Sequence, residues 1–186
     1  MELAGLTILT VGHSNRTLED FVTLLRSHKI GLVADVRRFP GSRRYPHFNQ
    51  ENLSSALREQ GIGYAHFAEL GGRRHARPDS PNSAWRNEAF RGYADYMETK
   101  EFETGIERLI AEARKQPTAI MCAEALWWQC HRSMISDYLK AAGCQVSHIL
   151  GSNKTEDHRY SQPAQILNGR LTYHQIEPQA EFALEK

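Results

Sequence analysis

The chain has 186 residues, of which 40% are hydrophobic, and carries a formal net charge of +1 at pH 7. This length suggests a single domain over residues 1–186, and the composition suffices for one continuous core. The near-zero charge gives no general argument for nucleic acid or a membrane surface. Three cysteines, no visible signal peptide and no apolar run of about 20 residues predict a cytoplasmic protein with no membrane partner.

The first half of the chain alternates short apolar runs with amphipathic segments. Residues 6–11, 31–36 and 63–67 are apolar runs of strand length, which predict three buried strands. The apolar residues between these runs recur at helical spacing, which predicts two intervening helices. Thr17 and Asn49 precede these helices and are expected to cap them with their side chains.

The second half begins with a long polar loop at residues 71–89, a length typical of functional or disordered segments. Helical spacing of apolar residues then predicts a short helix at 90–97, a long helix at 102–113 and a further helix at 133–142. Apolar runs predict strands at 118–121 and 146–150. Asn168 and Gly169 predict a type I′ turn within a β-hairpin at residues 166–171.

Strands and helices alternate over residues 6–150. This order favours an α/β fold with a mostly parallel sheet and helices on both faces, a Rossmann-like three-layer sandwich. Residues 151–186 form a C-terminal extension, and we expect its hairpin to add to the edge of the sheet.

A parallel sheet would gather polar side chains from four strands at its carboxyl edge, where ligands usually bind in α/β proteins. We expect His13, Ser14 and Asn15 there after the first strand, Asp35 and Arg37 after the second, Glu69 after the third, and Cys122 and Glu124 after the fourth. This gathering predicts one site built from distant segments.

Residues 121–132 join a predicted strand to a predicted helix and hold the densest group of reactive side chains. A thiol before a helix N-terminus can have a lowered pKa, so we expect Cys122 to act as nucleophile or thiolate. Glu124 and His131 would transfer protons, with His13 as a helper. Glu69 and Glu124 could also form an acid/base pair. The alternative is that Cys122 is a small buried hydrophobe.

The same segment raises the alternative of a metal site. Zinc and iron accept a mixed set of the kind formed by Cys122, Glu124, Cys130 and His131, with His13. The spacing C-x7-C-H is not a recognised zinc pair, and neighbouring Cys130 and His131 are expected to point apart on a helix. We therefore name no metal ligand and no cofactor.

The window from Arg37 to Arg91 contains ten arginines and no lysine, against five acidic residues. Arginine suits bidentate binding of phosphate, and aromatic residues nearby in sequence could stack on bases. Trp127 and Trp128 could add a stacking wall beside Cys122. The alternative is an ordinary solvated loop surface. We expect ligand contacts from Ser14, Asn15, Arg37, Arg43, Arg44, Glu69, Arg73, Arg74 and Arg132.

Several segments closely resemble the domain-of-unknown-function family 488. They are Val11-Gly-His-Ser-Asn15, Asp35-Val-Arg37, Ser42-Arg-Arg44, Phe48-Asn49, Glu69-Leu-Gly-Gly-Arg73, Phe90-Arg-Gly-Tyr-Ala-Asp95 and Cys122-Ala-Glu-Ala-Leu126 with Cys130-His-Arg132. The resemblance covers about residues 7–150 and implies a compact α/β domain, but no reaction. Trp127 and Trp128 depart from it, because they stand where the family is associated with a proline followed by an aromatic residue.

Together these features favour an enzyme that acts on a phosphate-bearing ligand, either a nucleotide or nucleic acid, at a pocket of Cys, Glu, His and Arg side chains. Three alternatives stay open: a non-catalytic nucleic-acid binding module, a metal or thiol redox protein, and a scaffold whose pocket only binds a partner. The sequence does not indicate the substrate, the oligomeric state or whether residues 71–89 form a lid.

Overall fold

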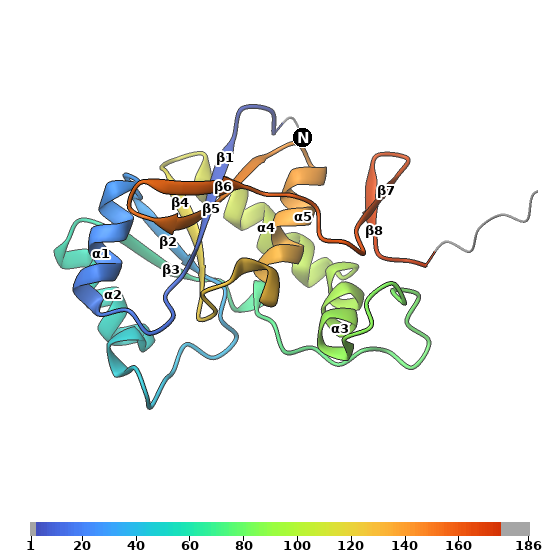
Figure 1. Cartoon of the computed structure of the whole chain (residues 1–186), viewed down its shortest axis with the longest axis horizontal. Helices are drawn as coiled ribbons and strands as arrows, with labels where there is room; N and C mark the ends of the chain where they lie inside the picture. Colours follow the sequence, from blue (N-terminus) through green and yellow to red (C-terminus); the bar gives the residue numbers. More distant parts are fainter. Residues whose placement is uncertain (1–2, 176–186) are drawn as a thin grey trace, which may run out of the picture.

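The computed structural model describes residues 3–175, and its main element is a six-stranded sheet (Figure 1). The strands are β1 (Thr7–Gly12), β2 (Leu32–Asp35), β3 (Gly63–His66), β4 (Thr118–Cys122), β5 (Gln145–Gly151) and β6 (Lys154–Asp157). They lie in the order β3-β2-β4-β1-β5-β6, and every pairing is parallel except that of β5 with β6. The predicted α/β fold with a mostly parallel sheet is confirmed.

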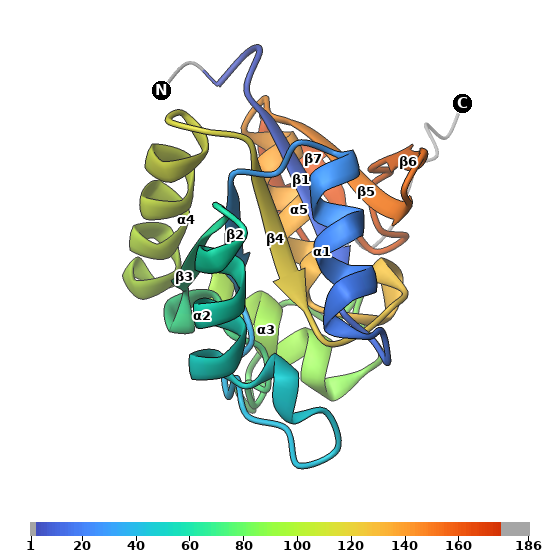
Figure 2. The ribbon, with the colours of Figure 1, turned by 90° about the vertical axis from the view of Figure 1, so that its left-hand side faces the viewer.

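The sheet is covered on both faces (Figure 2). The helices are α1 (Leu18–Ser27), α2 (Gln50–Glu59), α3 (Glu88–Met97), α4 (Lys100–Ala113) and α5 (Arg132–Ala141). Successive residues of a strand point to opposite faces, so Met121 packs with α1 and α2, whereas Cys122 packs with α3, α4 and α5. None of the helices within residues 3–175 is long and apolar enough to cross a bilayer.

Two polar residues at helix starts illustrate a success and a failure of local prediction. Thr17 caps α1 as expected, since its side chain accepts a hydrogen bond from the Asp20 backbone N–H at 3.0 Å. Asn49 precedes α2, but its side chain makes no capping bond. Its Oδ1 instead accepts from the Ser42 backbone N–H at 2.5 Å. Asn49 thereby ties residues 38–47, the arginine loop, to the start of α2.

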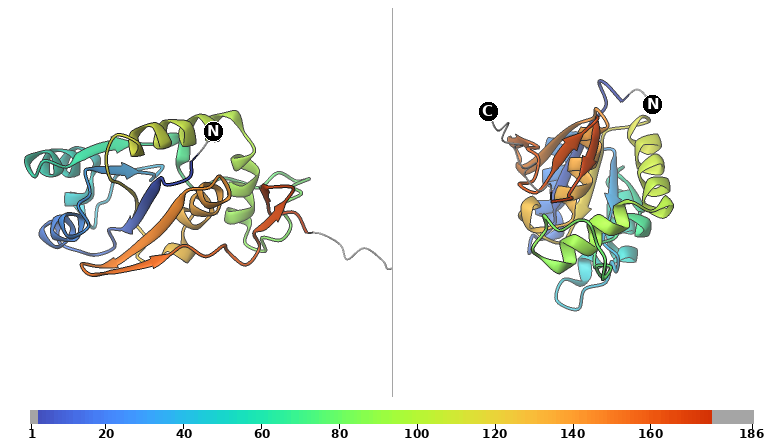
Figure 3. Two further views of the ribbon diagram at one scale, coloured as in Figure 1. Left: turned by 90° about the horizontal axis from the view of Figure 1, so that it is seen from above. Right: turned by 90° about the vertical axis from the view of Figure 1, so that its right-hand side faces the viewer.

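The C-terminal part differs in detail from the prediction. Strand β6 was not predicted, and it occupies the sheet edge by pairing antiparallel with β5. The predicted hairpin is present as β7 (Gln165–Leu167) and β8 (Arg170–Thr172), in a separate two-stranded sheet (Figure 3). Positive φ angles at Asn168 (50°) and Gly169 (76°) fit the type I′ turn. Residues 176–186 of the predicted extension lie outside the described part.

The ends of β1 and β4 are held together beyond the last strand residue. Gly12 pairs in register with Cys122, and the His13 backbone N–H donates to the Cys122 carbonyl at 3.0 Å. A Cβ at Gly12 would lie 1.9 Å from the Glu124 carbonyl oxygen, so only glycine permits this approach. The segments after these two strands therefore meet at one edge of the sheet.

Candidate functional site

A pocket of about 790 Å³ opens at the carboxyl edge of the sheet. Its walls come from the ends of β1, β2 and β4, the arginine loop, residues 71–89, the start of α3 and the segment before α5. The predicted site residues that line it are His13, Ser14, Asn15, Arg37, Arg44, Arg73, Cys122, Glu124 and His131. The lining residues outside the predicted catalytic and ligand-contact set include Arg38, Phe39, Tyr45, Asn87, Phe90, Tyr93 and Gln129.

Cys122, Cys130 and His131 form a close group on the pocket wall, here called the thiol–imidazole cluster. Their two sulfur atoms and a ring nitrogen all lie within 4.8 Å of one another. The Sγ of Cys130 is 3.6 Å from Nδ1 of His131. The expectation that these neighbours point apart on a helix is wrong, because α5 begins at Arg132 and Cys130 has an extended backbone (φ −137°, ψ 150°).

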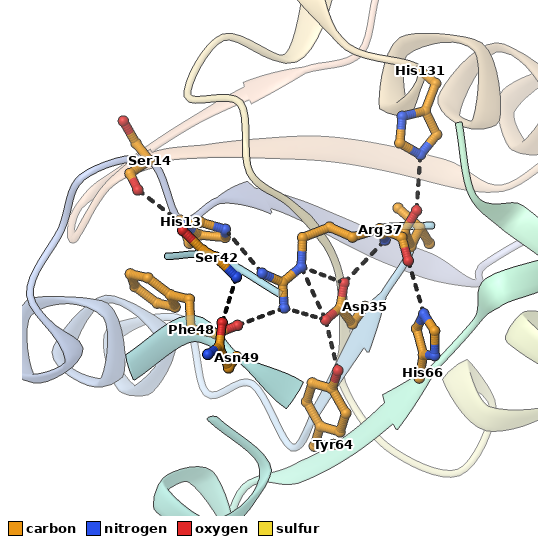
Figure 4. Close-up of polar contacts among 11 residues, drawn as sticks. His13, Ser14, Asp35, Arg37, Ser42, Phe48, Asn49, Tyr64, His66 and His131 are labelled. Atoms are coloured by element: carbon orange, nitrogen blue, oxygen red, sulfur yellow. Dashed lines mark hydrogen bonds and ion pairs between the residues drawn. The ribbon is translucent and has the colours of Figure 1, made fainter. Parts of the chain in front are cut away.

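A backbone hydrogen bond to the ring nitrogen that does not face Cys130 fixes the orientation of the His131 ring. Its Nε2 lies 3.0 Å from the backbone carbonyl of Val36 (Figure 4). A carbonyl only accepts, so Nε2 carries a proton and Nδ1 of the neutral ring presents a lone pair to Cys130. Gly72 lies against this ring, and a Cβ there would lie 2.8 Å from Nδ1. The backbone of residues 71–89 approaches so closely only because position 72 is glycine.

The two thiols of the cluster are unequal. The Arg132 backbone N–H, at the start of α5, lies 3.5 Å from Sγ of Cys130. Burial opposes ionisation of Cys130, but the hydrogen bond from Cys122, the interaction with His131 and the charge of Arg132 outweigh it and lower the pKa of this thiol well below its usual range. The hydrogen bond to Cys130, together with burial, raises the pKa of Cys122 well above its usual range. We predicted the thiolate at Cys122, whereas the structure favours Cys130, the cysteine adjacent to the helix N-terminus.

Arg37 is held in a buried ion pair with Asp35 (Figure 4). The Nη2–Oδ2 distance is 2.6 Å, and the side chains are 7% and 0% exposed. Arg37 also donates to the Phe48 carbonyl at 2.9 Å and to Nε2 of His13 at 3.3 Å. Its Nε, both Nη2 hydrogens and one Nη1 hydrogen are thus engaged inside the protein. This geometry suits support of the pocket wall better than the predicted ligand contact.

His13 has a similar supporting position. Its ring stacks on Phe48 with centroids 4.1 Å apart. Nδ1 lies 3.0 Å from the Ser14 carbonyl and carries the proton, so Nε2 accepts from Arg37. Burial, followed by the charge of Arg37, lowers the pKa of His13 to about 4. His13 is therefore neutral at pH 7 with both nitrogens engaged, which fits positioning of Arg37 better than the predicted proton transfer.

The mouth of the pocket carries three exposed arginines. Arg38 Nη1 donates to the Arg73 carbonyl at 2.9 Å, which joins the arginine loop to residues 71–89. Within residues 3–175, the guanidinium groups of Arg44 and Arg73 make no hydrogen bond or ion pair, and Arg44 lies 5.3 Å from the Tyr45 ring centroid. Glu124 supplies the one carboxylate among the described lining residues. The pocket therefore has an excess of positive charge.

Two predicted residues after β3 point elsewhere and do not line the pocket. Glu69 forms an ion pair with Arg108, with Oε1 and Nε 2.8 Å apart. The guanidinium of Arg74 lies 3.5 Å from the centroid of the Tyr96 ring. The structure therefore does not bring Glu69 to Glu124 as the predicted acid/base pair.

Arg132, Arg43 and the tryptophans also lie outside the pocket lining. Arg132 is 1% exposed, and its Nη2 donates to the Glu124 carbonyl at 2.5 Å, so it holds the segment that carries Glu124. Arg43 is exposed on the arginine loop. Trp127 is buried and Trp128 is exposed, and neither forms the stacking wall that we predicted beside the thiols.

The structure also contains a buried polar chain that the sequence reasoning missed, here called the closed histidine chain (Thr10, His148, His158 and Asp137). Thr10 Oγ1 is 2.7 Å from His148 Nδ1, His148 Nε2 is 3.0 Å from His158 Nδ1, and His158 Nε2 is 2.9 Å from Asp137 Oδ1. The Asp137 carboxylate only accepts, so every hydrogen bond runs from Thr10 toward Asp137. The one signal was a histidine inside the apolar run at residues 146–150, and its partner follows the unpredicted β6.

Residues 71–89 are fastened to α3 through Asp95. Its carboxylate accepts from the Arg77 backbone N–H at 2.8 Å, from Ser80 Oγ at 2.5 Å and from Asn82 Nδ2 at 2.9 Å. Burial opposes the charge of Asp95, but these hydrogen bonds and Arg77 outweigh it and lower the pKa of the carboxyl below its usual value. The middle of this loop is thus anchored, while Gly72 and Arg73 at its start line the pocket.

Comparison with known proteins gives one finding. The family model described as domain of unknown function DUF488 matches residues 17–139, which run from the cap of α1 almost to the end of α5. The searches of curated proteins and of solved structures found no match. The matched region is more than half of the chain and contains the thiol–imidazole cluster. This protein belongs to the domain-of-unknown-function family DUF488.

Proposed function

We propose that this protein is an enzyme that binds a phosphate-bearing small molecule, such as a nucleotide, in the pocket at the carboxyl edge of the sheet. The observation that carries the proposal is the charge of the pocket: four arginines and one carboxylate line it. The Asp35 carboxylate neutralises Arg37, so the charge available to a ligand comes from Arg38, Arg44 and Arg73.

The arrangement of these arginines supports a phosphate ligand. Arg44 and Arg73 belong to two different loops on the same pocket, and within the described residues their guanidinium groups make no hydrogen bond or ion pair. A guanidinium offers paired N–H donors that match phosphate oxygens, and two of them on different loops can bind one phosphate from two sides. A bound phosphate would be attracted by the positive charge of both side chains.

The size and aromatic lining favour a small molecule over a polymer. A volume of about 790 Å³ lies within the range of about 300–1,000 Å³ that is usual for small-molecule sites. Phe39, which is 66% exposed, lines the same pocket and offers a face on which a base can stack, while Phe90 in the lining already stacks on Trp85. A mononucleotide would use both features.

The reactive groups face the same space. The thiol–imidazole cluster and Glu124 line the pocket that the arginines border, so a ligand bound by its phosphate would lie beside them. Glu124 is exposed and accessible as the proton-transfer group. Cys122, Cys130 and His131 supply the remaining chemistry, with His13 and Arg37 as supports.

Ligand binding tests the proposal directly. Isothermal titration with inorganic phosphate, AMP, ATP and a short single-stranded RNA should detect binding of at least one mononucleotide. Arg44→Ala and Arg73→Ala should each weaken that binding about 10-fold or more, because a hydrogen bond to a charged group contributes about 1.5–3 kcal/mol. Glu124→Gln should leave binding nearly unchanged but reduce turnover once a substrate is found.

Arg43→Ala is the matched control, because Arg43 is exposed on the arginine loop beside Arg44 but does not line the pocket. It should change affinity by less than about twofold. Absence of mononucleotide binding, together with RNA binding that weakens steeply with salt and equally in Arg43→Ala and Arg44→Ala, would favour the non-catalytic nucleic-acid module instead.

A further inference from the structure

We propose that Cys122, Cys130 and His131 bind a single zinc ion and leave its fourth coordination position open to the pocket. This inference goes beyond the proposed function, because the ion would bind whether or not a phosphate-bearing ligand is present. Two thiolates and one imidazole form the soft donor set that zinc favours.

The distances suit one tetrahedral ion. Zinc bonds of about 2.3 Å to sulfur and about 2.0 Å to nitrogen place a sulfur and a nitrogen ligand about 3.6 Å apart, and two sulfur ligands about 3.8 Å apart. Cys130 Sγ and His131 Nδ1 are 3.6 Å apart, and all three ligand atoms lie within 4.8 Å of one another. Side-chain adjustments of less than about an ångström would therefore complete the three bonds.

The surroundings of His131 are those of a metal ligand. Histidine ligands usually donate their other ring N–H to a carbonyl or carboxylate, which fixes the tautomer and the ring orientation. The Val36 carbonyl does this for Nε2 at 3.0 Å and so directs the lone pair of Nδ1 toward the sulfurs. The Arg132 backbone N–H supports Cys130 Sγ in the same way at 3.5 Å.

The open position distinguishes this site from a purely structural one. Structural zinc sites usually have four protein ligands, whereas catalytic sites have three and keep one position for water or substrate. Cys122, Cys130 and His131 all line the pocket, so the fourth position would face the ligand space. Glu124 lines the same pocket and would be the carboxylate available to exchange a proton with a zinc-bound water.

A redox cysteine pair is the competing explanation for two neighbouring thiols. A disulfide would involve Cys122 and Cys130 but would leave the lone pair of His131 Nδ1 without a function. It would not require the close backbone approach at Gly72 that keeps this ring in place. The metal site accounts for all three side chains, and the experiment separates the two explanations.

Metal content and cobalt spectroscopy test the inference on the full chain under reducing conditions. Protein purified with zinc present and then desalted should hold about one zinc per chain by elemental analysis. Stripped protein titrated with Co²⁺ should develop intense visible bands of a tetrahedral site and a near-ultraviolet thiolate-to-cobalt band, saturating at one equivalent. Cys122→Ser, Cys130→Ser and His131→Gln should each weaken zinc binding more than about 100-fold, beyond the 10–100-fold cost of losing an outer-shell partner.

Cys144→Ser is the matched control, because Cys144 is also buried and free but is not part of the cluster. It should retain one zinc per chain with affinity changed less than about threefold. Gly72→Ala should weaken binding at least about 10-fold by displacing the His131 ring, with all three ligands still present. Circular dichroism would confirm that each variant is folded.

The inference is overturned if reduced, folded wild-type protein shows neither stoichiometric zinc nor the cobalt bands, whatever the variants do. A Cys122–Cys130 disulfide that forms in air, without metal binding after reduction, would support the redox explanation instead. These readouts use no phosphate compound, so they can fail while nucleotide binding succeeds, and the reverse.

Discussion

The thiol–imidazole cluster and the closed histidine chain contain similar groups but differ in what they leave unpaired. In the closed chain, both nitrogens of His148 and of His158 have protein partners, and Asp137 accepts from His158 at 2.9 Å. In the cluster, His131 presents a lone pair to two thiols on the wall of a pocket. Buried groups that are fully paired stabilise one structure, whereas ligating atoms that lack a final partner beside a pocket can bind a ligand.

The strongest test of this difference is Asp137→Ala in the closed chain. It removes the acceptor for His158, the Ser161 hydroxyl and the Tyr173 hydroxyl, and leaves buried donors without partners. We expect the free energy of unfolding to fall by at least about 3 kcal/mol. Urea denaturation monitored by circular dichroism measures this loss.

Cys130→Ala in zinc-free protein is the corresponding stability test for the thiol–imidazole cluster. It removes one small buried side chain and leaves no buried carboxylate without a partner, so the loss should be about 1 kcal/mol. Equal losses in the two variants would mean that both regions are structural.

Asp95→Ala extends the comparison to residues 71–89. This change removes the shared acceptor of Arg77, Ser80 and Asn82, and we expect a loss of about 1–3 kcal/mol together with faster proteolytic cleavage within the loop. The native pKa of Asp95 is below its unfolded value, so its stabilising effect is present above that value and disappears as pH falls through the native pKa. Unchanged protease resistance in the variant would show that other contacts hold the loop.

Acid should weaken the closed chain through His148. Burial, followed by the charges of His158 and Arg132, lowers the pKa of His148 to about 3. The unfolded histidine, with a pKa near 6.5, binds the proton more readily, so stability falls as pH drops from about 6.5 toward 3, by about 1.4 kcal/mol per pH unit. His148→Gln should flatten this dependence in urea denaturation at pH 4.5–7. The exposed His75→Gln should not, and an equal effect would refute the assignment.

The smallest effect on stability is expected at Arg44 and Arg73, the exposed arginines at the mouth of the pocket. Arg44→Ala and Arg73→Ala should each change the free energy of unfolding by less than about 0.5 kcal/mol, because neither guanidinium makes a hydrogen bond or ion pair within the described residues. Arg37→Ala is the contrasting variant and should lose several times as much, since it leaves Asp35 buried without its ion pair. Thermal unfolding of the three variants gives the comparison.

Regular patterns made the fold predictable. The alternation of apolar strands and amphipathic helices indicated the parallel sheet, and its carboxyl edge collects His13, Arg37 and Cys122 as expected. Strand β6 was missed because its residues, Lys154–Asp157, are polar and mostly exposed, so they carry no apolar alternation. Its place at the edge follows from pairing with β5, which is a tertiary property.

The site was less predictable because partners decide what each side chain can do. Arginine at positions 37, 44 and 73 looks equivalent in sequence, yet only the first meets a buried carboxylate. The prediction of a thiolate at Cys122 rests on its position between a buried strand and a helix start, but Cys130 is the thiol adjacent to the first residue of α5. A single backbone residue in extended conformation, Cys130, turns two neighbours toward each other.

The backbone immediately after β2 limits how the pocket can adapt to its occupant. The Val36 carbonyl is bonded to His131 and the Arg37 carbonyl to His66, at 3.0 and 2.8 Å (Figure 4). Because both carbonyls are hydrogen-bonded, any opening of the arginine loop must come from backbone rotation after Arg37. Ligands of different size would then be accommodated by the arginine loop at the mouth of the pocket, while the wall that carries the thiol–imidazole cluster keeps one shape.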